Sequence, residues 1–343
     1  MQRLEARWNI ENYDKQSRAN KLLHKLAILD FNMVQSVYQS DLQELSRWWK
    51  RVGLANKLSF ARDRLIESFF WAVGMVFQPQ FSKCRVGLTK VVKLITVLDD
   101  IYDVYGSPEE LQQLTDAVEK WDVNAVDHLP DYMKIFFLAL YNTANDLAYD
   151  TLKEQDQFVI SHLRKGWADL CKAFLREAEW RNKKHIPKFD EYIDHGWVSS
   201  SGAVLLTHAY FLISQNITDE AIKSLNHPMR FPCSIFRLAN DLTSSKDDAE
   251  RGELAKAVSC YMHETGVSDE VARDYVRKAI DQNWKMMNKE NAHNSLFDNS
   301  FIETASNLAR IALCQYQYGD AHTAPSDSSS NRIKSVIFEP IQL

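Results

Sequence analysis

The apolar residues of this chain recur every three to four positions along almost its whole length, and this helical period limits the possible folds more than any other feature. Two clear series are Leu22, Leu26, Leu29 and Phe31 to Val34, and Ile135, Phe136, Leu138, Ala139 and Tyr141. The alternation of polar and apolar residues that favours β-strands is nearly absent. With only 10 Gly and 8 Pro among 343 residues, the sequence predicts an all-α fold.

Short polar breaks divide the predicted helices. Ser107 offers an N-cap, Pro108 the first helical position and Glu110 the acid of a capping box, for a helix that continues to about Trp121. Other breaks are expected near residues 52–56, 77–80, 105–108, 127–130, 185–187, 226–232 and 322–331. The last is the longest and fits either a lid over a site or a plain surface loop. One large helical domain is the simplest organisation.

Charge and cysteine content argue against several classes of protein. A net charge of −5 without a basic cluster argues against nucleic acid as a partner. The five cysteines are scattered without a C-x-x-C pair, so neither a disulfide framework nor a zinc site is indicated, and a reducing compartment fits. No apolar run approaches the ~18 residues that span a bilayer. The N-terminal MQRLEARWNIENYDKQ has no signal-peptide core, so we expect no membrane segment.

Two carboxylates, Asp99 and Asp103, lie four residues apart in the run LDDIYD. Residues at this spacing share one face of a helix, where two negative charges repel unless a cation lies between them. Oxygen ligands are those that Mg²⁺ prefers. The pair therefore predicts a magnesium site that holds a phosphate-bearing substrate, and the alternative is a solvated acidic helix face.

A second set of oxygen ligands lies about 140 residues downstream, at Asn240, Ser244 and Asp248. Spacings of four residues align them along one helix face with a small angular drift. Taken alone, this stretch fits an exposed polar helix end at least as well. Together with Asp99 and Asp103 in one helical chain, it predicts a site for a further divalent ion.

Basic and aromatic residues flank both acidic motifs. The basic residues are Arg62, Arg64, Arg237 and Lys256; each alone fits a surface charge, but with two metal-binding faces they predict a diphosphate cage. The aromatic residues are Trp71, Phe236, Tyr316 and Tyr318, the last two expected in a C-terminal helix. Rings at helical spacing are most often core, yet a cleft lined by them would stabilise a carbocation and exclude water. One turn or two before Asp99, Val92, Ile95 and Thr96 should form an apolar pocket wall.

These motifs, in this order, resemble those of plant class I terpene synthases, specifically the angiosperm monoterpene synthase branch. Matching strings include RLEARW at residues 3–8, RDRLIESFFW, LDDIYDVYG, FRLANDLTSS and YQYGD. The resemblance runs from the first residues to nearly the last. It implies a class I terpenoid synthase helical bundle with a central cleft, in which residues 21–343 form the catalytic domain and residues 1–20 a remnant of an N-terminal domain.

The resemblance also implies roles for individual residues. Asp99 and Asp103 would bind Mg²⁺ on one side, and Asn240, Ser244 and Asp248 on the other, with three ions expected and Mn²⁺ a possible substitute. Arg62, Arg64, Arg237 and Lys256 would contact the diphosphate or close the site over it. Trp71, Val92, Ile95, Thr96, Phe236 and Tyr318 would line the substrate pocket. Residues 199–202 match a kinked helix, with Gly202 as the expected reason for the kink.

The implied reaction is the ionisation of geranyl diphosphate to an allylic cation that becomes a monoterpene. The diphosphate would accept the proton, with Tyr316 a weaker candidate. Val92 stands where isoprene synthases have a bulky phenylalanine, which favours a ten-carbon substrate; the alternatives are an isoprene or sesquiterpene synthase, or a truncated non-catalytic relic. A chain-elongating prenyltransferase should have a second DDxxD motif, and Asn240, Ser244 and Asp248 argue against it.

Two departures from the family pattern concern the site. Asp248 replaces the usual glutamate, and its side chain is shorter by one methylene. Val92 and Lys93 replace a polar amide or small residue of many relatives. The family location is the plastid, although this chain shows no transit peptide and would be cytosolic if expressed as it stands. We expect a monomer or weak homodimer, with a prenyl diphosphate as partner and neither nucleic acid nor membrane.

Overall fold

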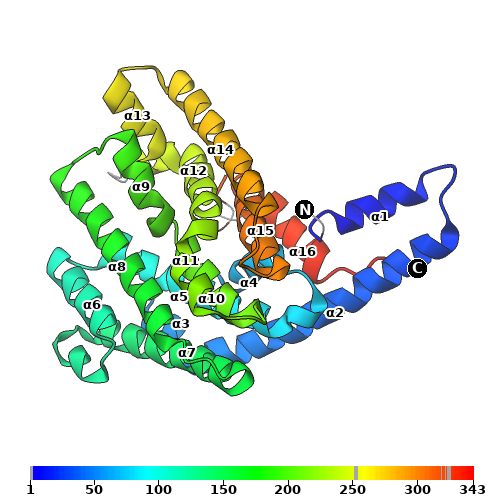
Figure 1. Ribbon diagram of the computed structural model, residues 1–343, viewed down its shortest axis with the longest axis horizontal. Coiled ribbons are helices and arrows are strands. Elements are labelled where there is room, and N and C mark those ends of the chain that lie inside the picture. The colour runs from blue at the N-terminus through cyan, green and yellow to red at the C-terminus, as the bar shows by residue number, and fades with distance from the viewer. Residues whose placement is uncertain (1–2, 251–253, 318, 321, 323–325) are drawn as a thin grey trace.

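The computed structural model describes residues 3–250, 254–317, 319–320, 322 and 326–343, and the side chains of residues 244–250 are not described. The described segments form helices and no named strand, so the all-α prediction is confirmed (Figure 1). The helices are α1 Ala6–Asp14, α2 Lys21–Val52, α3 Leu54–Lys57, α4 Leu65–Met75, η1 Pro79–Phe81, α5 Ser82–Asp100, η2 Ile101–Tyr105, α6 Pro108–Lys120, η3 Val123–His128, α7 Asp131–Gln155, α8 Ile160–Lys183, α9 Phe189–Ser199, α10 Gly202–Ile213, α11 Asp219–Ser224, α12 Asn226–Glu250, α13 Ala257–Thr265, α14 Asp269–Ala292, α15 Asn299–Gln315 and α16 Asp327–Ile337.

Two helices organise the bundle. Helix α5 packs against α2, α4, α7 and α10, and helix α12 packs against α9, α10, α14 and α15. Most side chains of α5 are therefore buried, including the charged Arg85, Lys93 and Asp100. Figure 1 shows that α1 and the first half of α2 extend away from this body as an arm.

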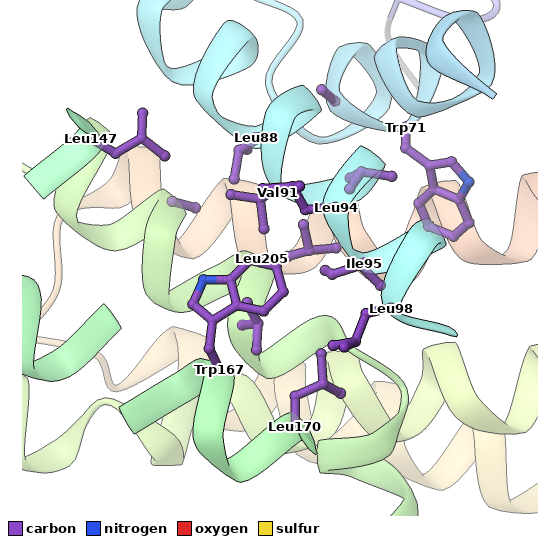
Figure 2. Packing of buried hydrophobic residues seen from close by; sticks show 14 of the residues in the cluster. Trp71, Leu88, Val91, Leu94, Ile95, Leu98, Leu147, Trp167, Leu170 and Leu205 are labelled. Carbon is purple, nitrogen blue, oxygen red and sulfur yellow. The ribbon is translucent and has the colours of Figure 1, made fainter. Parts of the chain in front are cut away.

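The apolar core lies around α5. Figure 2 shows Val91, Leu94 and Leu98 of this helix directed toward Trp167 and Leu170 of α8. All five side chains are at most 1% exposed. Burying apolar side chains of this size stabilises the fold by roughly 1.5–3 kcal/mol each. This packing against α8 therefore holds the C-terminal part of α5 in place.

The local helix signals are confirmed where they are strongest. The capping box at the start of α6 is present, with the Glu110 amide donating to Ser107 Oγ and the Ser107 amide donating to the Glu110 carboxylate at 2.9 Å. The expected breaks near residues 52–56, 77–80, 105–108, 127–130 and 185–187 all separate helices. Capping and turn chemistry act within a few residues, so the sequence alone reveals them.

Two expected breaks are present but lie earlier in the chain than expected, because α11 and α12 are separated at Leu225 and α16 begins at Asp327. Residues 226–232 form the start of α12, which continues through Pro232, since Met229 and Cys233 are buried on its inner face. Their packing outweighs the hydrogen bond that an interior proline removes. Residues 327–331 begin α16, because the Ser326 side chain accepts the Ser329 amide as an N-cap.

The three leucines that begin the first apolar series of the sequence face solvent rather than a core. Leu22, Leu26 and Leu29 are 77%, 60% and 46% exposed, whereas Ile28 and Phe31 of the same helix are buried against α1 and the C-terminal segment. The period correctly predicts the helix, but the choice of buried face depends on which segment packs beside it. As a separate finding, none of the helices in the described ranges is long and apolar enough to cross a membrane.

Candidate active site

A cavity of about 440 Å³ opens between α4, α5, α8, α9 and α12. Most of the residues singled out in the sequence lie on its wall, namely Arg62, Trp71, Val92, Ile95, Thr96, Asp99, Asp103, Phe236, Arg237, Asn240, Lys256 and Tyr316. The side chains of Ser244 and Asp248 are not described, and Tyr318 lies outside the described residues. The fold thus brings together groups from both halves of the sequence, one charged set and one apolar set.

The acidic pair lies where α5 changes its winding. Helix α5 ends at Asp100, and Asp103 belongs to the π-helical turn η2, so the expectation of one regular helix through both motif positions is wrong. A π turn is wider than an α turn and is frequent at functional sites. In this structure Asp99 Oδ2 pairs with Arg62 Nη2 at 2.6 Å, and Asp103 Oδ1 with Arg181 Nη1 at 3.2 Å.

Arg62 approaches the acidic pair from a loop. Residues 62–64 precede α4 and are not helical. The Arg62 amide donates to Asp100 Oδ2 at 2.8 Å, and its Nε lies 2.7 Å from Asp100 Oδ1. Burial by itself would lower the pKa of Arg62, but Asp99 and Asp100 raise it above its usual value. The guanidinium therefore stays charged at the mouth of the cavity.

Arg64 and Lys256 differ in their position relative to the cavity. Arg64 Nε donates to the carbonyl of His322 at 3.1 Å, and Arg64 is not among the residues that line the cavity. Lys256 lines the cavity and precedes α13. The structure therefore places Lys256, but not Arg64, where it can reach a ligand in the cavity.

Arg237 of α12 lies on the opposite wall in a network of buried partners. Its Nε lies 2.7 Å from the hydroxyl of Tyr192 and 3.2 Å from Asp241 Oδ1. Its Nη1 lies 3.3 Å from Glu177 Oε1, and Glu177 also accepts a hydrogen bond from Ser199 Oγ at 2.6 Å. Burial would raise the pKa of the Glu177 carboxyl, but Arg237 and His195 hold it well below its ordinary range.

The other end of the cavity is aromatic. The ring centroid of Trp71 lies 5.0 Å from that of Phe236 and 6.1 Å from that of Tyr316. Val92 and Ile95 are buried beside the rings, on α5. Thr96 Oγ1 donates to the Val92 carbonyl and lies 3.0 Å from His322 Nε2, so this hydroxyl already has partners. These walls suit a hydrocarbon and present electron-rich faces to a cation.

Tyr316 follows the end of α15 and is not in the helix where the sequence placed it. Burial, and then Asp320, raise the pKa of its phenol well above the usual value. The phenol is therefore protonated at neutral pH. It is poorly suited to receive a proton from another group.

The expected interruption at residues 199–202 is present, but Gly202 is not its conformational cause. Ser201 adopts the left-handed conformation, with φ of 68°, between α9 and α10. A Cβ at Gly202 would lie 2.7 Å from Cys233 Sγ and 3.0 Å from Leu308 Cδ2. Glycine is needed there for close packing of α10 against α12 and α15.

Several further residues on the cavity wall were not identified in the sequence, among them Asp100, Glu177, Arg181 and His322. Glu177 and Arg181 are four residues apart, and both lie on α8. Their spacing alone resembles an ordinary surface ion pair. Asp100 is adjacent to the recognised motif, yet only the structure shows that its carboxylate binds the amide and the guanidinium of Arg62.

The oxygen atoms on the charged wall are those expected for a hard divalent ion. Asp99 and Asp103 offer carboxylates and Asn240 an amide, which fit Mg²⁺ in kind. Within the ranges that the structure describes, no three acidic, histidine or cysteine side chains are grouped closely enough to hold a metal. In this arrangement Arg62 and Arg181 occupy the two carboxylates instead.

Fold and cavity together define an all-α protein suited to hold a polyanionic head and an apolar tail. Residues 50–286 match the sequence model described as terpene synthase family, metal binding domain. The chain belongs to this family.

Individual relatives are similar over nearly the whole chain. A chloroplastic tricyclene synthase of Medicago truncatula is 56% identical over 99% of this chain and 60% of that protein. A chloroplastic isoprene synthase of Populus alba is 55% identical over 99% of this chain and 58% of that protein. The chain thus spans somewhat more than half the length of these relatives.

Solved structures agree with this assignment. The isoprene synthase of grey poplar leaves, solved with three Mg²⁺ ions and dimethylallyl-S-thiolodiphosphate, matches with a TM-score of 0.95 at 55% identity. That match covers 99% of this chain and 66% of the poplar chain. A limonene synthase solved with 2-fluorolinalyl diphosphate matches with a TM-score of 0.94 at 40% identity, over 97% and 62% of the two chains. The class I terpene synthase fold is confirmed.

Proposed function

We propose that this chain is the catalytic part of a magnesium-dependent terpene synthase that ionises geranyl diphosphate and releases a monoterpene and diphosphate. The observation that carries the proposal is the division of one cavity into a charged wall, with Arg62 and Asp99, and an aromatic end, with Trp71 and Phe236. A prenyl diphosphate has the same division between head and tail. The cavity volume is also within the range of ligand sites, roughly 300–1,000 Å³.

At the charged wall, the proposed roles are binding and orientation. Arg62, Arg237 and Lys256 would meet the diphosphate oxygens, and Arg64 would support the closed site through the segment at His322. Asp99, Asp103 and Asn240 would hold Mg²⁺, together with Ser244 and Asp248; three ions are proposed by analogy with the poplar protein, and Mn²⁺ as a substitute. Bound Mg²⁺ supplies positive charge that favours departure of the diphosphate. The basic residues act in the same sense, because their hydrogen bonds strengthen as negative charge develops.

At the aromatic end, the residues exclude water and stabilise positive charge. Trp71, Phe236 and Tyr316 present ring faces to the space beside Val92 and Ile95. Thr96 and Tyr318 complete the proposed pocket. Because the Tyr316 phenol stays protonated, the departing diphosphate is the better acceptor for the proton that the cation loses.

A five-carbon substrate is the second candidate, because several isoprene synthases are about as similar to this chain as the tricyclene synthase is. The size of the Val92 side chain is the basis on which we choose between the candidates. A small residue at this point of the wall leaves room for a longer hydrocarbon tail, so we favour ten carbons over five.

The division into residues 1–20 as a linker remnant and 21–343 as the catalytic domain remains a proposal, as does the state of monomer or weak homodimer. A plastid location is proposed from the relatives named as chloroplastic. A prenyl diphosphate is the proposed partner.

The purified chain with Mg²⁺ should be incubated separately with prenyl diphosphates of five, ten and fifteen carbons, and the volatiles analysed by gas chromatography and mass spectrometry. We expect product chiefly from the ten-carbon substrate. Val92→Phe should lower that rate and spare a five-carbon one. Product from the shortest substrate alone would favour isoprene synthesis, and no product from any would favour a non-catalytic relic.

Asp103→Ala tests the metal assignment in the same assay. Turnover should be lost while the circular dichroism spectrum and melting temperature stay unchanged, since Arg181 keeps its hydrogen bond to the Tyr102 carbonyl. Asp150→Ala removes an exposed carboxylate of α7 as a matched control. An unchanged rate in Asp103→Ala would contradict the role given to Asp103.

A further inference from the structure

Lys93 is a lysine that is completely buried yet lies outside the cavity. Its Nζ donates to the carbonyl of Arg62 at 2.5 Å. The same ammonium lies 4.4 Å from the ring centroid of Trp49 and 3.9 Å from Asp63 Oδ1. Each of these contacts is with the loop of Arg62 or with the helix that supports it.

Lys93 and Asp100 hold Arg62 from one face of α5. They are seven residues apart, which is about two helical turns, so their side chains point in nearly the same direction. Lys93 binds the carbonyl of Arg62, and Asp100 binds its amide and its Nε. Both peptide groups of one residue are thereby fixed to the helix that carries Asp99.

Burying the ammonium of Lys93 costs free energy, which a purely structural contact does not require. Burial lowers the pKa of Lys93 to about 8, although Asp63 of the loop, Asp100 of the same helix and Glu67 of α4 oppose this, while Arg62 adds to it. A buried ammonium destabilises the folded state relative to an apolar side chain of similar size. Retaining it therefore makes sense where a carbonyl must be held in one place.

We propose that Lys93 is a positioning residue, which fixes the backbone of Arg62 and thereby the direction from which its guanidinium meets a diphosphate. This inference rests on the proposed function, because it assumes that Arg62 binds the substrate head. Lys93 itself touches neither the cavity nor the substrate.

The test compares Lys93→Met, which removes the donor and the charge, with Lys93→Gln, which retains an N–H donor. Binding of inorganic pyrophosphate in the presence of Mg²⁺ is measured by calorimetry, and the melting temperature is measured on the same samples. Lys90→Met is the matched control, since Lys90 lies one turn earlier on α5 and faces Trp48. We expect Lys93→Met to weaken pyrophosphate binding at least tenfold with an unchanged or higher melting temperature, Lys93→Gln to recover part of the affinity, and Lys90→Met to behave as wild type.

A merely structural role would lower the melting temperature and the affinity together in both Lys93 variants, and that result would overturn the proposal. Unchanged pyrophosphate affinity in Lys93→Met, or no binding by the wild type, would overturn it too. The wild type should also lose affinity above about pH 8 by a step that Lys93→Gln lacks; the same step in both proteins would count against Lys93.

Pyrophosphate binding also separates this inference from the proposed function. If the wild type makes no terpene but binds pyrophosphate in a manner that depends on Lys93, the reaction assignment fails and the positioning role stands. If the wild type makes a monoterpene and Lys93→Met binds pyrophosphate and turns over equally well, the positioning role alone fails.

Discussion

Arg62 and Arg237 face one cavity from opposite walls, but their surroundings differ. The Arg62 side chain is 22% exposed, lies on a loop and pairs with two carboxylates of the same helix. The Arg237 side chain is 8% exposed and joins α12 to partners on α8 and α9, and one of its carboxylate partners, Asp241, is completely buried.

The comparison shows that one residue type can serve a binding site in two ways. Arg62 can exchange Asp99 for a phosphate at moderate cost, because both of these side chains are partly exposed, at 22% and 37%. Arg237 cannot leave its partners without exposing buried charge, so its position is set by the fold. We therefore expect Arg62 to affect mainly binding and Arg237 to affect mainly stability.

The largest expected effect is that of Arg237→Met. It leaves Asp241 buried without its counter-ion and should lower the free energy of unfolding by about 3–5 kcal/mol. Urea unfolding followed by circular dichroism measures this change. Arg230→Met is the control on the same helix, because Arg230 pairs with Asp194 at the surface and should shift the value by only about 0–1 kcal/mol. Equal effects of the two variants would remove the distinction between buried and exposed arginines.

Arg62→Ala should have the reverse profile. The loss of one preorganised donor to developing negative charge should lower kcat by about 10²–10³-fold. The free energy of unfolding should fall by less than in Arg237→Met, because the lost partner Asp99 is partly exposed and the amide of residue 62 can still donate to the buried Asp100. Steady-state kinetics with geranyl diphosphate provides the measurement, and Arg51→Ala, an exposed position near the end of α2, the control. A large loss of stability with normal kinetics would show that Arg62 stabilises the fold, as Arg237 does, and does not serve binding.

The pH dependence of unfolding should sharpen the contrast further. The native pKa of Glu177 lies below its ordinary value of 4.5, so the unfolded chain binds a proton that the native protein does not. The stability contributed by Glu177 is present above that value and is lost as the pH falls through and below it. Glu177→Gln should reduce the fall in melting temperature between roughly pH 6 and pH 3. This range brackets the ordinary glutamate pKa of about 4.5. If the melting temperature of Glu177→Gln falls with pH as steeply as that of the wild type, other carboxyl groups cause the loss of stability in acid.

The smallest effect is expected from Ser199→Ala. It removes the hydrogen bond that Ser199 donates to the Glu177 carboxylate and the 3.4 Å bond that it accepts from Arg237 Nη1, while the ion pair between Arg237 and Glu177 remains. We expect a loss of about 1–2 kcal/mol of stability, measured by the same urea titration. Ser46→Ala removes a hydroxyl that bonds only within α2 and gives the baseline. A loss as large as that of Arg237→Met would mean that Ser199 is essential to the network.

The sequence revealed the chemistry of the site more reliably than its geometry. Asp99, Asp103, Arg62 and Trp71 were recognisable by type and spacing, and the structure places all four on one cavity. The π turn at Asp103, the non-helical loop at Arg62 and the partners of Arg237 were not recognisable. Each depends on a neighbour that is distant in the sequence.

The sequence by itself determined the helical class, the caps and the set of oxygen, cationic and aromatic groups available to the site. These follow from interactions within a few residues, such as the helical period and the capping box at Ser107. Only the tertiary structure decided which face of each helix is buried, and that Arg62 is partly exposed while Arg237 and its partner Asp241 are buried. The physical reason is that burial and the partners of a charge, which set the cost of moving it, depend on helices brought together from distant parts of the chain.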